Sequence, residues 1–149
     1  KLYGADSGDG TKQIIENLIE ELHAQDWVLL MGGSDELEKL LPKASVYAFS
    51  SDWEGLPNGV LEAMAMGLPV VSTDCPCGGP RDLIRDGENG FLVPVNDAEA
   101  LARRLEELLS DPEKAGRIGK EAAKIGQAYA PEKVNAEWER YFEGIAGRS

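Results

Sequence analysis

Two glutamates, Glu54 and Glu62, stand at the ends of a segment whose residue types suit a ligand rich in hydroxyl and phosphate groups. An ionised carboxylate accepts hydrogen bonds from the neighbouring hydroxyls of a sugar. Between the glutamates, Pro57 is placed to open a helix, because proline is favoured at the first helical position. The first amides of a helix have no partner inside it and lie at its positive end, which suits a phosphate. The segment therefore predicts a ligand held by its two ends, and a nucleotide-sugar has the required groups.

The residues around Pro57 define the phosphate end more closely. With Pro57 at the first helical position, we expect the amides of Asn58, Gly59 and Val60 to be unpaired by the helix. The glycines on either side of Pro57 let a ligand approach the backbone closely. Glu62 then lies about 7.5 Å along the helix axis from Pro57, at about 1.5 Å per residue, which is close to the distance from a phosphate to the far edge of a ribose.

Spacing alone does not identify this segment. Two further pairs of glutamates eight residues apart fall inside predicted helices: Glu99 with Glu107, and Glu113 with Glu121. Glu54 and Glu62 differ from these pairs in their context, because an apolar run precedes them and a Gly-x-Pro sequence separates them. A helix stop at Gly67 and an apolar run at residues 70–73 follow. Ligands of open α/β sheets bind outside the carboxyl ends of the strands, where this context places the segment.

The elements that must position the segment alternate between strands and helices. Apolar runs predict strands at residues 2–6, 27–31, 46–49, 70–73 and 91–93, and the run at 27–31 is typical of a strand buried on both faces. Helical periodicity predicts the intervening and following helices. The expected fold class is α/β, a Rossmann-like open parallel sheet with helices on both faces and a helical C-terminal third. We expect one domain over residues 1–149.

Capping residues and inward-facing leucines refine the predicted helices. Asp9 or Thr11 would cap the first helix, and Asp97 a later one. Pro112 and Pro131 would open the last two. In the helix after Asp97, the leucines expected to face inward are Leu101, Leu105, Leu108 and Leu109.

Composition excludes several classes of function. The formal net charge of −12 argues against a surface that binds nucleic acid or anionic lipid headgroups. No apolar run approaches the roughly 20 residues of a membrane helix, and no basic stretch precedes a signal-like core. Cys75 and Cys77 are too close for an unstrained disulfide and too few for a structural zinc site, so we expect two reduced thiols in a cytosolic loop. Because residue 1 is Lys, we expect the chain to derive from a longer one.

A few other residues invite a functional interpretation. His23, the single histidine, is expected on the surface near a helix end. Arg81 could reach a phosphate, although a structural role in its loop is favoured, and Asp74 could line the cleft or cap the next turn. One stripe of the last helix carries Trp138, Tyr141, Phe142 and Ile145. Such a stripe is most often core, and the alternative is that it docks on a part of the protein that this chain lacks. If the stripe is exposed, we expect self-association through the C-terminal helix.

Residues 49–94 closely resemble the C-terminal, donor-binding domain of the retaining GT-B glycosyltransferases known as glycosyl transferases group 1. The family signature, two glutamates separated by seven residues, is met by Glu54 and Glu62. Further family-like sequences follow in the expected order at residues 72–76, 79–84 and 86–94. The resemblance extends more loosely over nearly all of the chain.

The resemblance implies transfer of a sugar from a nucleotide-sugar to an acceptor hydroxyl, with retained anomeric configuration and with neither metal nor cofactor. It implies that Glu62 holds the ribose hydroxyls. Glu54 would be the catalytic residue, binding the donor sugar and stabilising positive charge at its anomeric carbon, as a nucleophile or electrostatically. The donor sugar and diphosphate would meet the intervening backbone, formed by Gly55, Leu56, Pro57, Asn58 and Gly59. Family frequency favours UDP as the nucleotide, with the base expected near residues 32–34.

The chain also departs from the family pattern. It lacks the first strand and loop that supply an Arg and a Lys to the diphosphate. It also lacks the N-terminal domain, through which the family binds its acceptor, here a glycan or lipid-linked glycan. Because these parts are missing, we expect this chain alone to be inactive. We expect the whole enzyme to be cytoplasmic, with or without peripheral association with the inner membrane face. Two alternatives are a non-catalytic nucleotide-binding module and a GT-B nucleotide-sugar epimerase.

Overall fold

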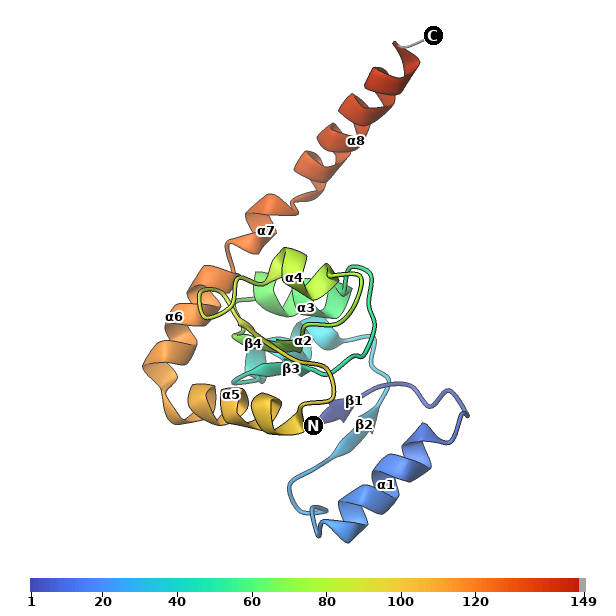
Figure 1. Ribbon diagram of the computed structural model, residues 1–149, viewed down its shortest axis with the longest axis vertical. Coiled ribbons are helices and arrows are strands. Elements are labelled where there is room, and N and C mark those ends of the chain that lie inside the picture. Colours follow the sequence, from blue (N-terminus) through green and yellow to red (C-terminus); the bar gives the residue numbers. More distant parts are fainter. Residues whose placement is uncertain (148–149) are drawn as a thin grey trace. The chain divides into compact units, whose positions relative to one another are not determined.

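The computed structural model describes residues 1–147, which fall into two compact units (Figure 1). The first unit is Lys1–Lys39, and the second begins at Leu40. Every strand pairing in both units is parallel, as expected from the alternation of strands and helices. The predicted α/β class with a helical C-terminal third is therefore confirmed, with the described strands arranged in two sheets.

The first unit contains a two-stranded sheet, one complete helix and the first three residues of α2 (Leu37–Leu40), which ends at the first residue of the second unit. Strand β1 (Leu2–Tyr3) pairs with β2 (Leu30–Gly32), and α1 (Thr11–Glu21) connects them. Gly10 is the N-cap residue of α1, with φ 88°, while the Asp9 carboxylate accepts the Thr11 amide beside it, so neither predicted residue is the cap. His23 follows α1 and is exposed, as expected.

The prediction of a doubly buried strand at residues 27–31 is wrong. The strand begins only at Leu30, and the side chains of Trp27, Leu29 and Met31 are 70%, 45% and 44% exposed. Two short strands and one helix do not supply enough surface to cover both faces of a sheet. The apolar run therefore reflects a requirement for burial that this unit does not itself meet.

The second unit is built on a three-stranded sheet in the order β3-β4-β5. Its strands are β3 (Tyr47–Phe49), β4 (Val70–Thr73) and β5 (Phe91–Val93), preceded by α2 (Leu37–Leu40) and a 3₁₀ turn (Leu41–Lys43). Helix α3 (Asn58–Ala65) joins β3 to β4, and α4 (Gly79–Leu83) lies between β4 and β5. All four residues of β4 are buried, as expected for a central strand.

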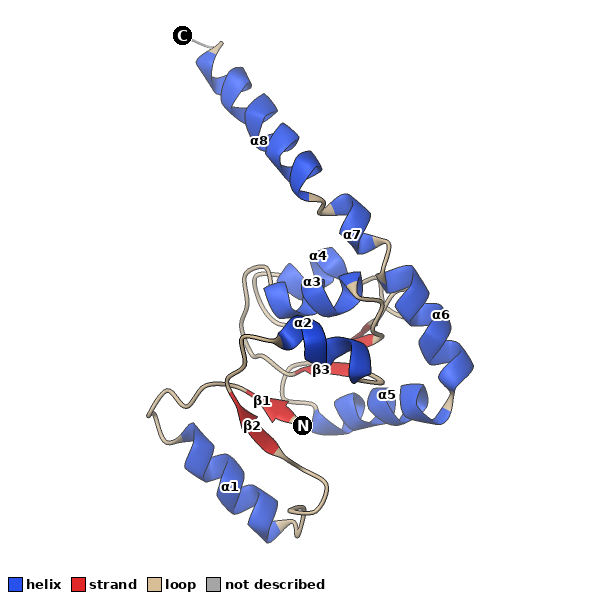
Figure 2. Cartoon of the chain, turned by 180° about the vertical axis from the view of Figure 1, so that it is seen from behind, coloured by secondary structure: helices blue, strands red, loops and turns tan. Residues whose placement is uncertain are grey.

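Helices cover both faces of this sheet. Figure 2 shows α3 and α5 (Ala98–Ser110) on opposite sides of it. On the α5 side the core contains six buried residues: Val71, Phe91, Val93, Ala100, Leu108 and Ile118. On the α3 side the buried residues include Val60 and Met64 of the helix. The two faces follow from the strand period of two, because alternate residues of β4 supply the two cores.

The C-terminal helices begin where capping residues predict. Asp97 accepts the Ala100 amide at the start of α5, at 2.8 Å, and Asp111 accepts the Lys114 amide at the start of α6 (Pro112–Ala122), at 2.9 Å. A short α7 (Ile125–Ala128) precedes α8 (Pro131–Ala146). Leu108 is buried as expected, but Leu109 is 58% exposed because it lies one residue further round α5, so that prediction is wrong.

Helix α8 contains no buried residue, so its aromatic stripe is not part of the core. The side chains of Trp138, Tyr141, Phe142 and Ile145 are each more than half exposed. The three rings contact one another, with centroids 5.6 to 5.9 Å apart. The favoured interpretation of this stripe is therefore wrong, because a helical stripe is core only where another element packs on it. Across the described residues, no helix combines the length and apolarity that crossing a membrane requires.

Candidate functional site

The loop that carries Glu54 lies at the carboxyl end of β3, as predicted, and it is tied to the neighbouring strand. At the end of β4, the Thr73 hydroxyl donates a hydrogen bond to the Ser51 carbonyl, at 2.5 Å. The Ser51 hydroxyl lies 3.0 Å from Glu54 Oε1 and 3.1 Å from the Trp53 carbonyl, so one donor serves two acceptors. Glu54 is therefore half-buried and positioned through Ser51 by the buried strand β4.

Helix α3 begins one residue later than expected. Pro57 is the N-cap residue, with φ −78° and ψ 99°, and the first helical residue is Asn58. The Pro57 carbonyl accepts both the Val60 and the Leu61 amides, each at 3.1 Å, so the prediction that the Val60 amide is unpaired is wrong. The amides of Asn58 and Gly59 have no acceptor among the described residues, so two of the three predicted amides are available.

Glu62 lies on the exposed surface of α3, three residues after Gly59. Residues three apart lie on the same face of a helix, so the Glu62 side chain projects on the face where Gly59 has none. The loop residues Gly55 and Leu56 are also exposed, whereas Pro57 is buried. The predicted site residues therefore surround the first turn of α3, with their polar groups open to solvent.

Tyr47 also belongs to this region, although no motif of the sequence marks it as functional. Its hydroxyl lies 2.8 Å from the position that a Cβ on Gly59 would occupy. Burial raises the pKa of the Tyr47 hydroxyl, and the negative charges of Glu62 and then Glu54 raise this pKa further. The phenol is consequently neutral near pH 7 and lies within electrostatic reach of both glutamates. The alternation of β3 was the available signal, since it places Tyr47 on the α3 side of the sheet together with Phe49.

Gly79, the first residue of α4, packs against the loop between Glu54 and α3. A Cβ at this position would lie 1.4 Å from the Gly55 carbonyl oxygen and 3.0 Å from Pro57 Cδ. The backbone of α4 therefore packs directly against the loop between Glu54 and α3, and only glycine permits this approach. Gly79 belongs to one of the family-like sequences, but this contact could not be read from the sequence.

Arg81 and Asp74 are paired with each other. Arg81 Nε lies 3.0 Å from Asp74 Oδ1, and Arg81 Nη2 lies 2.5 Å from Asp74 Oδ2. This two-point contact is the kind of loop interaction expected of a structural Arg81, and it raises the pKa of Arg81 above its ordinary value. Asp74 makes this ion pair and does not cap the following turn. Nearby, Cys75 is buried and Cys77 exposed, and both are free thiols as expected.

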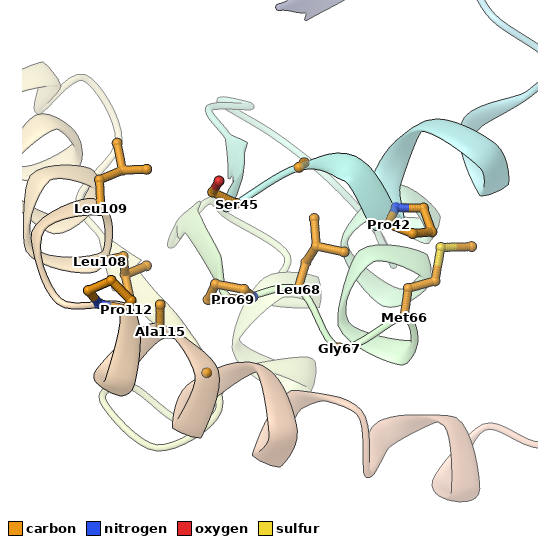
Figure 3. A pocket seen from close by; sticks show the side chains of 12 residues that line it. Pro42, Ser45, Met66, Gly67, Leu68, Pro69, Leu108, Leu109, Pro112 and Ala115 are labelled. Atoms are coloured by element: carbon orange, nitrogen blue, oxygen red, sulfur yellow. The ribbon is translucent and has the colours of Figure 1, made fainter.

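Two hollows among the described residues are lined by segments other than the Glu54 loop. In the second unit, a hollow of about 440 Å³ lies at the amino ends of β3 and β4 (Figure 3). It is lined by Ser45, by residues 66–69 and by the junction of α5 with α6. In the first unit, a hollow of about 550 Å³ adjoins Gly4, Asp6 and Gly32, so Gly32 of the expected base site lies on its wall.

The site can bind a ligand through complementary polar groups. Two carboxylates supply hydrogen-bond acceptors, and two free amides at the start of α3 supply donors at the positive end of a helix. Among the described residues, no group of three or more His, Cys, Asp or Glu side chains could hold a metal ion. The geometry therefore suits an uncharged polyol joined to an anionic group.

This chain is similar to known proteins in sequence and in fold. The family profile described as glycosyl transferases group 1 matches residues 2–125. The lipopolysaccharide core biosynthesis glycosyltransferase LpsE of Rhizobium meliloti is 38% identical over 105 residues, which cover 70% of this chain and 30% of LpsE. The chain spans about a third or less of the length of the curated relatives that it matches.

Two solved structures show the same fold. HepE of Anabaena, in complex with UDP, superposes with a TM-score of 0.90 at 24% identity over 96% of this chain and 40% of HepE. A variant of S. aureus TarM, in a complex that includes UDP, gives a TM-score of 0.85 at 28% identity over 94% of this chain and 28% of TarM. With the profile match over most of its length, the chain therefore belongs to the glycosyl transferases group 1 family and has the fold of a C-terminal GT-B domain.

Proposed function

We propose that this chain is the donor-binding part of a retaining glycosyltransferase that moves a sugar from a UDP-sugar to an acceptor hydroxyl. The observation that carries the proposal is the grouping of Glu54, Glu62 and the free amides of Asn58 and Gly59 around the first turn of α3. Family membership supports the transfer reaction. The UDP found with TarM supports the choice of nucleotide.

Each group has a defined role in the proposal. Glu62 accepts hydrogen bonds from the ribose hydroxyls, and the Asn58 and Gly59 amides bind the diphosphate. Negative charge grows on the diphosphate as it leaves, and fixed amides at a helix start stabilise it without rearrangement. Glu54, held by Ser51, binds the donor sugar and stabilises positive charge at the anomeric carbon. The proposed reaction uses no metal.

The acceptor and the completed reaction belong to a longer protein. The chain spans 30% of the length of LpsE, whose name assigns it to lipopolysaccharide core biosynthesis, which supports a glycan acceptor. We propose that the remaining part supplies the acceptor site and the cations for the diphosphate, and that this chain alone does not transfer sugar. A transfer assay with UDP- and GDP-sugars tests this point, and turnover above background by the chain alone would contradict it.

Nucleotide binding tests the proposed function directly. UDP, GDP and ADP are titrated by calorimetry against the chain, Glu62→Ala and a control, Glu99→Ala. Glu99 shares the eight-residue spacing with a second glutamate but lies on the exposed surface of α5. We expect UDP to bind best, with Glu62→Ala weakening binding about 10- to 100-fold through lost hydrogen bonds to a charged group.

Three other outcomes of the same titration would contradict separate parts of the proposal. Failure of all three nucleotides to bind would contradict the proposed donor site. Tighter binding of GDP or ADP would contradict the choice of UDP alone. Equal losses in Glu62→Ala and Glu99→Ala would show that the ribose assignment is wrong.

A further inference from the structure

The side chain of Tyr47 is fixed beneath the start of α3. Its ring stacks on Phe49, two residues along the same strand, with the ring centroids 6.4 Å apart and the planes 16° apart. Its hydroxyl occupies the space that a side chain on Gly59 would need. Tyr47 and Gly59 are therefore a matched pair, in which the absence of one side chain makes room for the end of the other.

The Tyr47 hydroxyl makes no hydrogen bond with any of the described residues. Every fully buried polar side-chain atom among those residues has a hydrogen-bond partner. The hydroxyl is therefore open to solvent, although burial and two carboxylates act on it. Gly59 and Glu62 share a face of α3, so this free hydroxyl lies on the side of the helix that carries the Glu62 carboxylate.

A carboxylate and a neutral phenol are complementary partners for a hydroxyl group. An ionised carboxylate can only accept hydrogen bonds, whereas a phenol can donate one. When a ribose hydroxyl donates a hydrogen bond to Glu62, its oxygen retains lone pairs that can accept a second hydrogen bond. The Tyr47 hydroxyl can donate that hydrogen bond to the ribose oxygen. Its raised pKa means that it keeps its proton at neutral pH.

We propose that Tyr47 is a second ribose-binding residue, whose hydroxyl donates a hydrogen bond to the oxygen of a ribose hydroxyl, while that same hydroxyl donates a hydrogen bond to Glu62. This inference rests on the proposed function, because it requires a nucleoside diphosphate at the start of α3. It also accounts for Gly59, since a Cβ there would lie 2.8 Å from the Tyr47 hydroxyl and would push the phenol out of its position. The pair selects a ligand with free ribose hydroxyls over one that lacks them.

The test compares two ligands on each of three proteins. The diphosphate that binds best among UDP, GDP and ADP, and its dideoxy counterpart without ribose hydroxyls, are titrated against the chain, Tyr47→Phe and Tyr141→Phe. Tyr47→Phe keeps the ring that stacks on Phe49, and Tyr141→Phe removes the same atom from the exposed stripe of α8. The ratio of the two affinities is internal to each protein, so it does not depend on the folded fraction.

We expect Tyr47→Phe to weaken the ribose ligand about 2- to 10-fold and to leave the dideoxy ligand unchanged, as befits one lost neutral hydrogen bond. Tyr141→Phe should change neither affinity. Equal weakening of both ligands by Tyr47→Phe would assign the tyrosine a packing role and overturn the inference. An unchanged affinity would also overturn it. Failure of the unmodified chain to bind any diphosphate would overturn the proposed function, and this inference with it.

Discussion

The replacement Gly79→Ala should disable the site without removing any of the groups that bind the ligand. The new Cβ would lie 1.4 Å from the Gly55 carbonyl oxygen, and protein Cβ atoms essentially never approach closer than 3.0 Å. The backbone of α4 and the loop after Glu54 must therefore move apart by at least the difference between these two distances. Because Gly55 is exposed while Gly79 is buried, the loop is the part that moves.

The expected size of the effect follows from that displacement. Misplacement of binding groups by about 1 Å can cost roughly 100-fold in activity, so we expect nucleotide affinity to fall about 10- to 100-fold. Overpacking of this kind costs about 1–3 kcal/mol in the free energy of unfolding, which calorimetry or urea denaturation measures. Gly116→Ala is the matched control, because a Cβ there meets nothing within 4 Å inside helix α6, and this variant should be slightly more stable.

The nucleotide affinities of the two alanine variants show whether the packing of α4 against the loop positions the site. Gly79→Ala should lose affinity while Gly116→Ala binds as the unmodified chain does. If Gly79→Ala bound nucleotide normally, the close packing of α4 against the loop would have no role in positioning the site.

Three further predictions concern titration and association. Lys114 and then Arg104 lower the pKa of Glu107, so Glu107→Gln should reduce the free energy of unfolding by about 0.5 kcal/mol at neutral pH. This difference should vanish as the pH falls below the ordinary value of 4.5 and through the lowered pKa of the folded state. A difference that persists in acid would contradict the prediction. Because the pKa of Tyr47 is raised, the ultraviolet absorbance change that the chain shows and Tyr47→Phe lacks should have its midpoint above the usual value near 10, and a midpoint at or below that value would refute this. The exposed stripe of α8 should cause concentration-dependent association in sedimentation, weakened in Phe142→Glu, and a monodisperse monomer at high concentration would exclude it.

Local patterns were sufficient to predict most elements of the fold. Apolar runs and helical periodicity depend on neighbouring residues only, and they located β3, β4 and β5 within a residue or two. Asp97 and Asp111 cap their helices through bonds to residues three positions on, which is also local. The start of α3 differs by one residue because Pro57 suits the N-cap and the first helical position alike.

Burial and long-range contacts could not be predicted in this way. The exposed Trp27 and Trp138 lie in patterns typical of buried elements, but burial depends on what packs against a segment. The bond from Thr73 to Ser51 joins residues 22 positions apart, and the contact of Gly79 with Gly55 is similarly distant in sequence. The sequence therefore identified the groups that could meet a ligand, whereas only the fold revealed the residues that position them.

If a nucleoside diphosphate binds around the first turn of α3, titration with UDP should change the amide chemical shifts of that turn in NMR spectra. We expect the amides of Asn58 and Gly59 to shift most with UDP and much less with uridine, which lacks the diphosphate. Glu62 should respond to both ligands. Largest shifts at the hollow between Ser45 and the junction of α5 with α6, with Asn58 and Gly59 unaffected, would contradict this prediction.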